Sequence, residues 1–180
     1  MDIKFSYHPT ESEIKMSVTL YESAFPQEER RPTAEWVNYI REKEAFTLHL
    51  IKESHTNQFL GFITTWDFSD FVYVEHFAII PPLWGFGFGS MAFKEILQKA
   101  GSKPLVLEVE PPTDFQAYRR IQFYERLGMH LMPFPYQQPS YASELSPIPL
   151  QLMCSQDLQD EATWSHMIHA IHKQVYGKND

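Results

Sequence analysis

The chain contains little cysteine and no long apolar run, and both absences restrict where it can work. A single cysteine, Cys154, stands among 180 residues, so no disulfide can form within the chain. A reducing cytoplasm is therefore the setting we expect. No apolar run approaches the roughly 18 residues that a membrane span needs, and Met1 to Lys4 lack the pattern of a signal peptide. We therefore expect a cytoplasmic protein with no membrane partner.

Basic residues are also few. The chain has 15 Lys and Arg against 23 Asp and Glu, which gives a formal net charge of −8. A surface that binds nucleic acid must neutralise phosphates, so this balance argues against a nucleic acid partner. The excess negative charge would attract a cationic acceptor such as an amine, and it would equally serve solubility alone.

A glycine-rich turn is the most distinctive motif present. Trp84 to Ser90 (WGFGFGS) follows a run of β-branched and aromatic residues, Phe71 to Ile80, that ends at two prolines and is typical of a strand. Apolar residues between Met91 and Ala100 then fall largely on one helical face. Glycine lacks a Cβ and tolerates positive φ, and the first N–H groups of a helix carry roughly half a positive charge. The turn therefore suits a cofactor that carries phosphate.

Two common phosphate-binding motifs do not fit this turn. A P-loop requires Gly-Lys-Ser/Thr after its last glycine, but Ser90 is followed by Met91, and no lysine comes before Lys94. A dinucleotide fold places G-x-G-x-x-G after its first strand, whereas G-x-G-x-G here follows at least two earlier strand-like runs. The spacing alone leaves a purely structural turn open.

Three segments together resemble GCN5-related N-acetyltransferases (GNATs). Phe77 to Ser90 resembles their acetyl-coenzyme A motif, Q/R-x-x-G-x-G/A, at the end of the fourth strand. The triplet LEV at 107–109 resembles their fifth strand, and FYERLGM at 123–129 resembles their F-Y-x-x-L-G-F signature. One departure stands out, because Trp84 occupies the position that is usually Arg or Gln.

The resemblance implies a fold, an activity and a cofactor site. The fold would be α/β (α+β), with a mixed, mostly antiparallel central sheet flanked by helices and a splay between the fourth and fifth strands. The activity would be transfer of an acetyl group from acetyl-coenzyme A to a primary amine by direct attack. The cofactor-binding residues it implies are Phe77, Ala78, Ile79, Ile80, Trp84, Gly85, Phe86, Gly87, Phe88, Gly89, Ser90 and Tyr124.

Periodicity predicts the remaining elements. Helices are expected at 13–24 with Ser12 as a possible cap, from Thr33 as cap to 41, at about 114–127 and at about 156–176. Strands are expected at 46–51, 59–66, 71–80, 105–110, 129–132 and 148–153. We expect an N-acetyltransferase domain over 1–154 and a C-terminal helical extension over 155–180.

Acetyl transfer to an amine needs a base and an acid. An alkylammonium has a pKa of about 10, so a base must remove its proton before attack, directly or through water. The resemblance makes Tyr124 the general acid beside the cofactor sulfur. Glu75, Glu108 and Glu110 compete for the acceptor side, because carboxylates within apolar strands are costly unless solvated, paired or functional. We favour Glu75 and Glu108, either as the base or as joint ligands of the ammonium.

Strand alternation predicts which of these side chains share a face. It places Glu108 and Glu110 together, puts Glu75 with Tyr73 and Phe77, and turns His76 away from Glu75. A packed or surface histidine is therefore the favoured interpretation of His76. Three histidines also recur at every third position of the terminal helix, but no cysteine or carboxylate cluster joins them, so we predict no metal. These histidines are His166, His169 and His172.

Two loops are expected to form the acceptor pocket. The aromatic and proline-rich segment at 133–141 offers Tyr136 and Tyr141, and the connector before Pro32 offers Phe25, Glu28 and Glu29; Glu110 completes the predicted acceptor residues. The acceptor would be a small-molecule or peptide amine. A non-catalytic acyl-coenzyme A-binding or regulatory module is the alternative, but it needs neither Tyr124 nor the carboxylates. A homodimer through the terminal helix is compatible with either.

Overall fold

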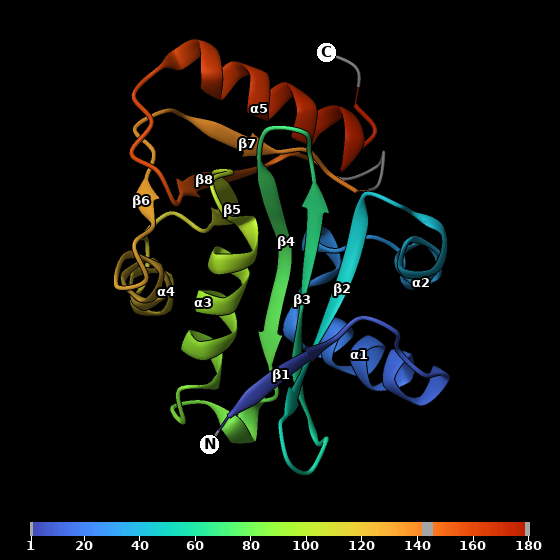
Figure 1. Cartoon of the computed structure of the whole chain (residues 1–180). Coiled ribbons are helices and arrows are strands. Elements are labelled where there is room, and N and C mark those ends of the chain that lie inside the picture. The colour runs from blue at the N-terminus through green and yellow to red at the C-terminus, as the bar shows by residue number, and fades with distance from the viewer. Residues whose placement is uncertain (1, 142–145, 179–180) are drawn as a thin grey trace.

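The structure is a computed structural model that describes residues 2–141 and 146–178. Its centre is an eight-stranded sheet in the order β1-β2-β3-β4-β5-β8-β6, with β7 paired to β8 (Figure 1). Among the described residues, β4 and β5 pair in parallel and the other strand pairs are antiparallel. The strands are β1 (Ile3–Ser6), β2 (Phe46–Glu53), β3 (Phe59–Asp67), β4 (Val72–Ile79), β5 (Leu105–Val109), β6 (His130–Leu131), β7 (Tyr136–Gln138) and β8 (Ile148–Cys154). The mixed, mostly antiparallel sheet expected from the sequence is thus confirmed.

Helices cover both faces of the sheet. The core on one face contains side chains from α1, α2 and α5, and the core on the other contains side chains from α3 and α4 (Figure 1). The helices are α1 (Glu11–Ala24), α2 (Thr33–Glu42), α3 (Phe88–Ala100), α4 (Phe115–Glu125) and α5 (Glu161–Gln174), with short 3₁₀ turns at Gln27–Glu29 (η1) and Pro81–Leu83 (η2). No helix in the described residues is long and apolar enough to cross a membrane.

The first two helices begin differently from the prediction. The cap of α1 is Thr10, not Ser12: its hydroxyl accepts from the Glu13 N–H, and the Glu13 carboxylate accepts from the Thr10 N–H. This reciprocal pair satisfies two donors that a helix start leaves free. Thr33 is the first residue of α2 and follows Pro32, which caps it without a side-chain hydrogen bond.

The two central parallel strands separate after a short pairing. Val72, Tyr73 and Val74 of β4 pair with Leu105, Val106 and Leu107 of β5. Beyond Val74 and Leu107 the register stops, although β4 continues to Ile79 and β5 to Val109. The sheet therefore splays toward the end of β4, at which the chain turns into α3.

A β-bulge in β4 lies at the start of this splay. On the β3 side, Thr64 pairs with His76 and the next residue, Thr65, pairs with Val74, so Glu75 is the extra residue on β4. A bulge shifts the alternation of side chains by one position. The face predicted for Phe77 is accordingly wrong: Phe77 packs with the α3 and α4 core, whereas Tyr73 belongs to the opposite core.

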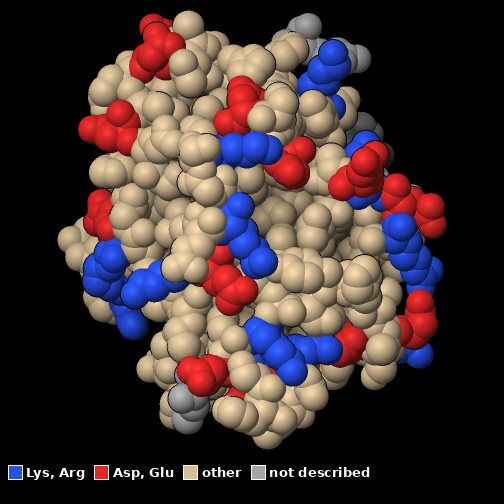
Figure 2. Space-filling view, in the orientation of Figure 1, with Lys and Arg blue, Asp and Glu red and all other residues tan. Residues whose placement is uncertain are grey.

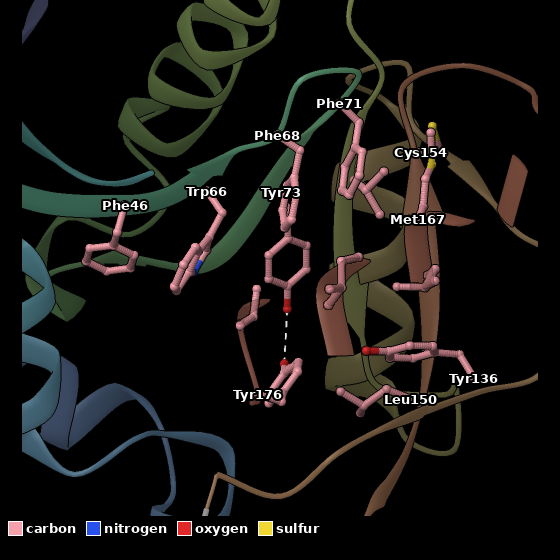
Figure 3. Close-up of a cluster of buried hydrophobic side chains, with 14 of the residues drawn as sticks. Phe46, Trp66, Phe68, Phe71, Tyr73, Tyr136, Leu150, Cys154, Met167 and Tyr176 are labelled. Carbon is pink, nitrogen blue, oxygen red and sulfur yellow. Dashed lines mark hydrogen bonds between the residues drawn. The ribbon is translucent and has the colours of Figure 1, made fainter. Parts of the chain in front are cut away.

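The C-terminal helix belongs to the main core. Trp164, Met167 and Ile171 of α5 are buried in the same cluster as Tyr73 and Trp66 of the sheet. Figure 3 shows Tyr176, which follows α5, facing Tyr73 of the sheet. Helix α5 therefore closes one face of the sheet.

Two short strands escaped the sequence analysis. β1 adds an edge strand beside β2, and β7 falls inside the segment that was expected to be a loop. Helix α5 also starts later than expected, because Asp160 caps it through the Thr163 N–H. On the face seen in Figure 2, acidic and basic side chains are interspersed.

Candidate active site

The glycine turn presents an open helix start. Gly85 and Gly87 have φ values of 85° and 87°, a conformation that favours glycine, and Gly87 is the N-cap of α3. No side chain caps this helix, and the first bond of the helix runs from the Met91 N–H to the Gly87 carbonyl. A Cβ built on Gly87 meets no atom within 4 Å. Residues 85–87 are exposed, and the first N–H groups of a helix have no partner within it, so the turn suits an anion.

Trp84 takes no part in charge neutralisation at this turn. Its indole Nε1 donates to the Ile79 carbonyl at 2.7 Å, and the residue is 67% exposed. Phe86 is also exposed, at 61%. The turn therefore presents two aromatic side chains where the resemblance implies a cation.

The other residues expected at the cofactor divide between the two faces of β4. Phe77 and Ile79 pack against the α3 core, and a Cβ on Gly89 would contact both side chains at 3.6–3.8 Å. Ala78 and Ile80 belong to the opposite core. Phe88 is buried in the α3 core, and Ser90 is partly buried in the first turn of α3.

The two favoured carboxylates meet at the vertex of the splay. Val74 of β4 and Leu107 of β5 form the last pair between these two strands, and Glu75 and Glu108 are the residues that follow them. They are close enough for the charge of Glu75 to raise the pKa of Glu108. The structure thus brings together the carboxylates that alternation had placed only on separate strands.

Glu75 is a buried anion in a saturated ion pair. Arg31 Nη2 lies 2.6 Å and Arg31 Nε 3.2 Å from Glu75 Oε1. Trp66 Nε1 donates to Oε2 at 2.9 Å, and the Tyr141 hydroxyl donates to Oε1 at 2.9 Å. Burial opposes ionisation, but these partners, chiefly Arg31, hold the pKa of Glu75 below its ordinary value. Its side chain is 0% exposed.

Glu108, in contrast to Glu75, is bound by phenols rather than by a cation. Its carboxylate accepts from the Tyr136 hydroxyl and lies 3.1 and 2.9 Å from the Tyr176 hydroxyl, with no cation among these partners. Burial raises the pKa of Glu108 to about 7, although the phenol hydrogen bonds lower it. A carboxyl group with a pKa near neutrality is suited to acid–base work.

Tyr124 lies on the other face of the sheet. Its ring packs in the α3 and α4 core, 5.0 Å from the Phe93 ring and 5.1 Å from the Phe123 ring, measured between centroids. Burial raises the pKa of Tyr124 to about 12. The phenol is therefore fully protonated at neutral pH and able to donate.

The predicted acceptor residues are only partly brought together. The Phe25 ring packs on His76 at 4.6 Å, and the Glu29 carbonyl is 3.0 Å from His76 Nε2. Tyr136 and Tyr141 bind the two vertex carboxylates, as described above. Glu28 is exposed on η1, and Glu110 lies beyond the end of β5 in an ion pair with Arg120.

His76 does not turn away from Glu75. Because of the bulge, both side chains lie on the face of α1 and α2, and His76 Nδ1 is 4.0 Å from Glu75 Oε2. Burial lowers the pKa of His76, so the imidazole is neutral at neutral pH. Of the two interpretations that alternation favoured, a packed or a surface histidine, the structure shows the packed one, since His76 is 4% exposed.

Several residues of this cluster were missed. Arg31 lay within the charged connector but was given no role. Trp66 and Tyr73 lay in predicted strands, Gln138 in the segment expected to be a loop, and Tyr176 at the end of the predicted terminal helix. A buried glutamate demands donors, so Glu75 itself was a signal that a cation such as Arg31 must come from elsewhere. The spacing of residues in the sequence could not identify which cation this is.

A groove opens beside this cluster. It has a volume of about 650 Å³ and is lined by residues 131–137, Pro111 and residues 149–151. The proline-rich segment expected to cover the acceptor pocket thus forms one wall of a groove that includes Tyr136. The groove is mostly apolar apart from Gln137 and Gln151.

A splayed mixed sheet, with a glycine turn leading into a helix at the open end, is the architecture of an acetyltransferase domain. A sequence profile described as "Acetyltransferase (GNAT) family" matches residues 14–129. The chain therefore belongs to the GNAT acetyltransferase family. No match to this chain was found among curated proteins.

Solved structures agree with this assignment. A GNAT-family protein from Bacteroides thetaiotaomicron is 34% identical, with a TM-score of 0.89, and the match covers 98% of this chain and 99% of that one. The ribosomal-protein-S18-alanine N-acetyltransferase from Escherichia coli is 16% identical, with a TM-score of 0.60 over 85% and 92% of the two chains. A chimeric spermidine N-acetyltransferase from Vibrio cholerae is 11% identical, with a TM-score of 0.64 over 86% and 95%. These last two share the fold alone.

Proposed function

We propose that the protein transfers an acetyl group from acetyl-coenzyme A to a primary amine, with Glu108 as the base and Tyr124 as the acid. The observation that carries this proposal is the splay vertex, where a carboxyl group with a pKa of about 7 stands at the point at which β4 and β5 part. A general base works best when its pKa lies near the working pH.

The glycine turn fits a coenzyme that carries pyrophosphate. Its N–H groups at the start of α3 and the open space before Gly87 would hold the phosphates, and the unpaired edge of β4 up to Ile79 offers backbone groups to the rest. Trp84 and Phe86 would contribute aromatic surface in place of a cation. Acetyl-coenzyme A supplies the activated acetyl thioester.

Proton transfer on the acceptor side would fall to Glu108. The carboxylate takes a proton from the alkylammonium, directly or through a water, and frees the lone pair of the amine for attack. Glu75 is unsuited to this step, because its pKa is lowered and its oxygens are already bound by Arg31, Trp66 and Tyr141. Burial is the main cause of the raised pKa of Glu108, and the negative charge of Glu75 adds to it.

Proton transfer on the cofactor side would fall to Tyr124. Its phenol is neutral at physiological pH and lies in the core between α4 and α3, the helix that starts at the glycine turn. The hydroxyl would donate its proton as the thiol departs, and the protons removed and donated then balance.

Two chemistries of acceptor deserve priority in a screen. Proteins of this fold include one named for a ribosomal-protein alanine and one named for spermidine, so a peptide N-terminus and a polyamine both belong in the panel. Burial raises the pKa of Glu29, and the negative charge of Glu110, which lies near it, raises that pKa further. They would attract the cationic part of such an acceptor.

The test is release of free thiol from acetyl-coenzyme A in the presence of polyamines, amino sugars, amino acids and peptides. We expect turnover with at least one amine, and loss of about 10²-fold or more in Glu108→Gln. The matched control is Glu42→Gln, which removes an exposed carboxylate at the end of α2 and should leave turnover unchanged. Binding of coenzyme A without turnover on any amine would instead identify a non-catalytic module.

A further inference from the structure

The chain leaving α5 returns to the splay vertex. Tyr176, two residues beyond the end of α5 at Gln174, is 8% exposed, and its hydroxyl lies 3.1 and 2.9 Å from the two carboxylate oxygens of Glu108. These residues are 68 positions apart in sequence. Figure 3 shows the Tyr176 hydroxyl bonded to that of Tyr73, with the Tyr136 hydroxyl pointing toward the same space.

The hydrogen bonds around Tyr176 have a consistent direction. Gln138 Nε2 can only donate, so at 3.0 Å it occupies one lone pair of the Tyr176 oxygen. An ionised Glu108 can only accept, so the Tyr176 proton points to it. The Tyr73 hydroxyl lies 3.1 Å from that of Tyr176, and a hydrogen bond from Tyr73 also lowers the pKa of Glu108. The hydroxyls of Tyr176 and Tyr136 therefore both donate to the Glu108 carboxylate.

We propose that Tyr176 is a positioning residue for Glu108, through which the C-terminal helix holds the base at the splay vertex. This inference rests on the proposed role of Glu108. The tyrosine touches neither acceptor nor cofactor in the mechanism above. It orients the carboxylate and stabilises its ionised form.

The helix itself is tied to the same vertex. Arg31 Nη2, which binds Glu75, also donates to the Val175 carbonyl at 2.9 Å. The residue before Tyr176 is therefore anchored to the neighbouring carboxylate. The Arg31 guanidinium binds both Glu75 and the Val175 carbonyl, and the Tyr176 phenol binds Glu108. The two residues that follow α5 are thus connected to both carboxylates.

Other titratable groups surround the Glu108 carboxylate, and a test must distinguish their effects from that of Tyr176. Glu75 and Tyr73 face it from β4, Tyr136 from β7 and Tyr141 from the chain that follows β7. The His172 ring of α5 lies 5.6 Å from the Tyr136 ring. Arg31 stands behind Glu75. Tyr136 and Tyr176 hydrogen-bond to Glu108, and a hydrogen bond from Tyr73 also lowers its pKa.

The experiment compares wild type with Tyr176→Phe, which keeps the ring and removes the hydroxyl. Loss of a donor to the carboxylate should move the acidic limb of kcat/KM toward higher pH by about one unit, so activity on that limb falls roughly tenfold and recovers at high pH. The titration of Glu108 is followed independently by NMR of carbon-13-labelled glutamate carboxyls, with Glu108→Gln assigning the resonance. Its midpoint should shift by the same amount.

Two control variants separate this role from packing and from histidine titration. Ile171→Val removes one buried methylene from α5 without touching the carboxylate, and should lower stability but leave both midpoints in place. His172→Gln should also leave the Glu108 resonance midpoint in place. An unchanged Glu108 midpoint in Tyr176→Phe overturns the proposal, even if amine acetylation is confirmed. Absence of acetylation with a shifted midpoint would instead refute the proposed function and leave the coupling established.

Discussion

Replacing Arg31 by methionine should destabilise the fold far more than a surface charge change does. Arg31 is 2% exposed and Glu75 0% exposed in side-chain terms, and their closest contact is 2.6 Å. Removing one member of a buried pair leaves an uncompensated charge and costs about 3–5 kcal/mol. Arg31→Met also loses the bond to the Val175 carbonyl. We therefore expect a loss at the upper end of that range.

The double variant Arg31→Met/Glu75→Gln measures the contribution of the interaction between the two charges to stability. With both charges gone, Trp66 and Tyr141 still have an amide to bond. Its loss of stability should be smaller than the sum of the two single losses by about 1–3 kcal/mol, as neighbouring groups in one network show. The assay is urea unfolding at pH 7 for the four proteins, with the midpoint and slope reported together.

The pH dependence of the pair has a definite sign. The folded pKa of Glu75 lies below its ordinary value of 4.5, so its stabilisation is present above that pH and is lost as pH falls through the folded pKa. Wild type should therefore lose more stability between pH 5 and acid than the double variant does. Single losses below about 1 kcal/mol, or strict additivity, would refute a coupled buried ion pair.

Two further substitutions test the cofactor side. Tyr124→Phe should lower kcat about 10²-fold while the dissociation constant of coenzyme A, measured by calorimetry, stays within about twofold; unchanged turnover would remove Tyr124 from the acid role. Gly87→Val places a β-branched side chain at a φ of 87°, so it should cost at least roughly 1–2 kcal/mol of stability and weaken coenzyme A binding. Gly89→Ala is the matched control for binding, because its Cβ points inward to ordinary contacts with Phe77 and Phe123; equal weakening by both would contradict a phosphate in front of Gly87.

Local patterns were enough to locate the framework of this fold. Strand composition identified the runs that became β2 to β5, and the glycine turn marked the start of α3 because positive φ at Gly87 has a strong residue preference. The expected splay followed from the family resemblance rather than from any residue count. The strands and the start of α3 could be predicted because the patterns that indicate them lie within the same short stretches of sequence.

The arrangement at the vertex depends on partners that are distant in sequence. The bulge at Glu75 is a mismatch in register with β3, so no pattern within β4 reveals it, and the predicted faces of His76 and Phe77 were wrong for that reason. Arg31 is 44 positions from Glu75. A three-residue strand such as β7, among prolines, carries too little periodicity to be found.

The two vertex carboxylates show how one strand gap produces two different acid–base groups. Glu75 and Glu108 are equivalent in position, each one residue past the last pair between β4 and β5, and both are buried. Only their donors differ: a guanidinium binds one, and neutral phenols bind the other. A cation stabilises the anionic form strongly enough to outweigh burial, whereas phenols do not. The pKa values therefore move in opposite directions, and the permanent charge of Glu75 pushes that of Glu108 further up. The bulge adds His76 to the same face, because it interrupts the alternation directly after Glu75.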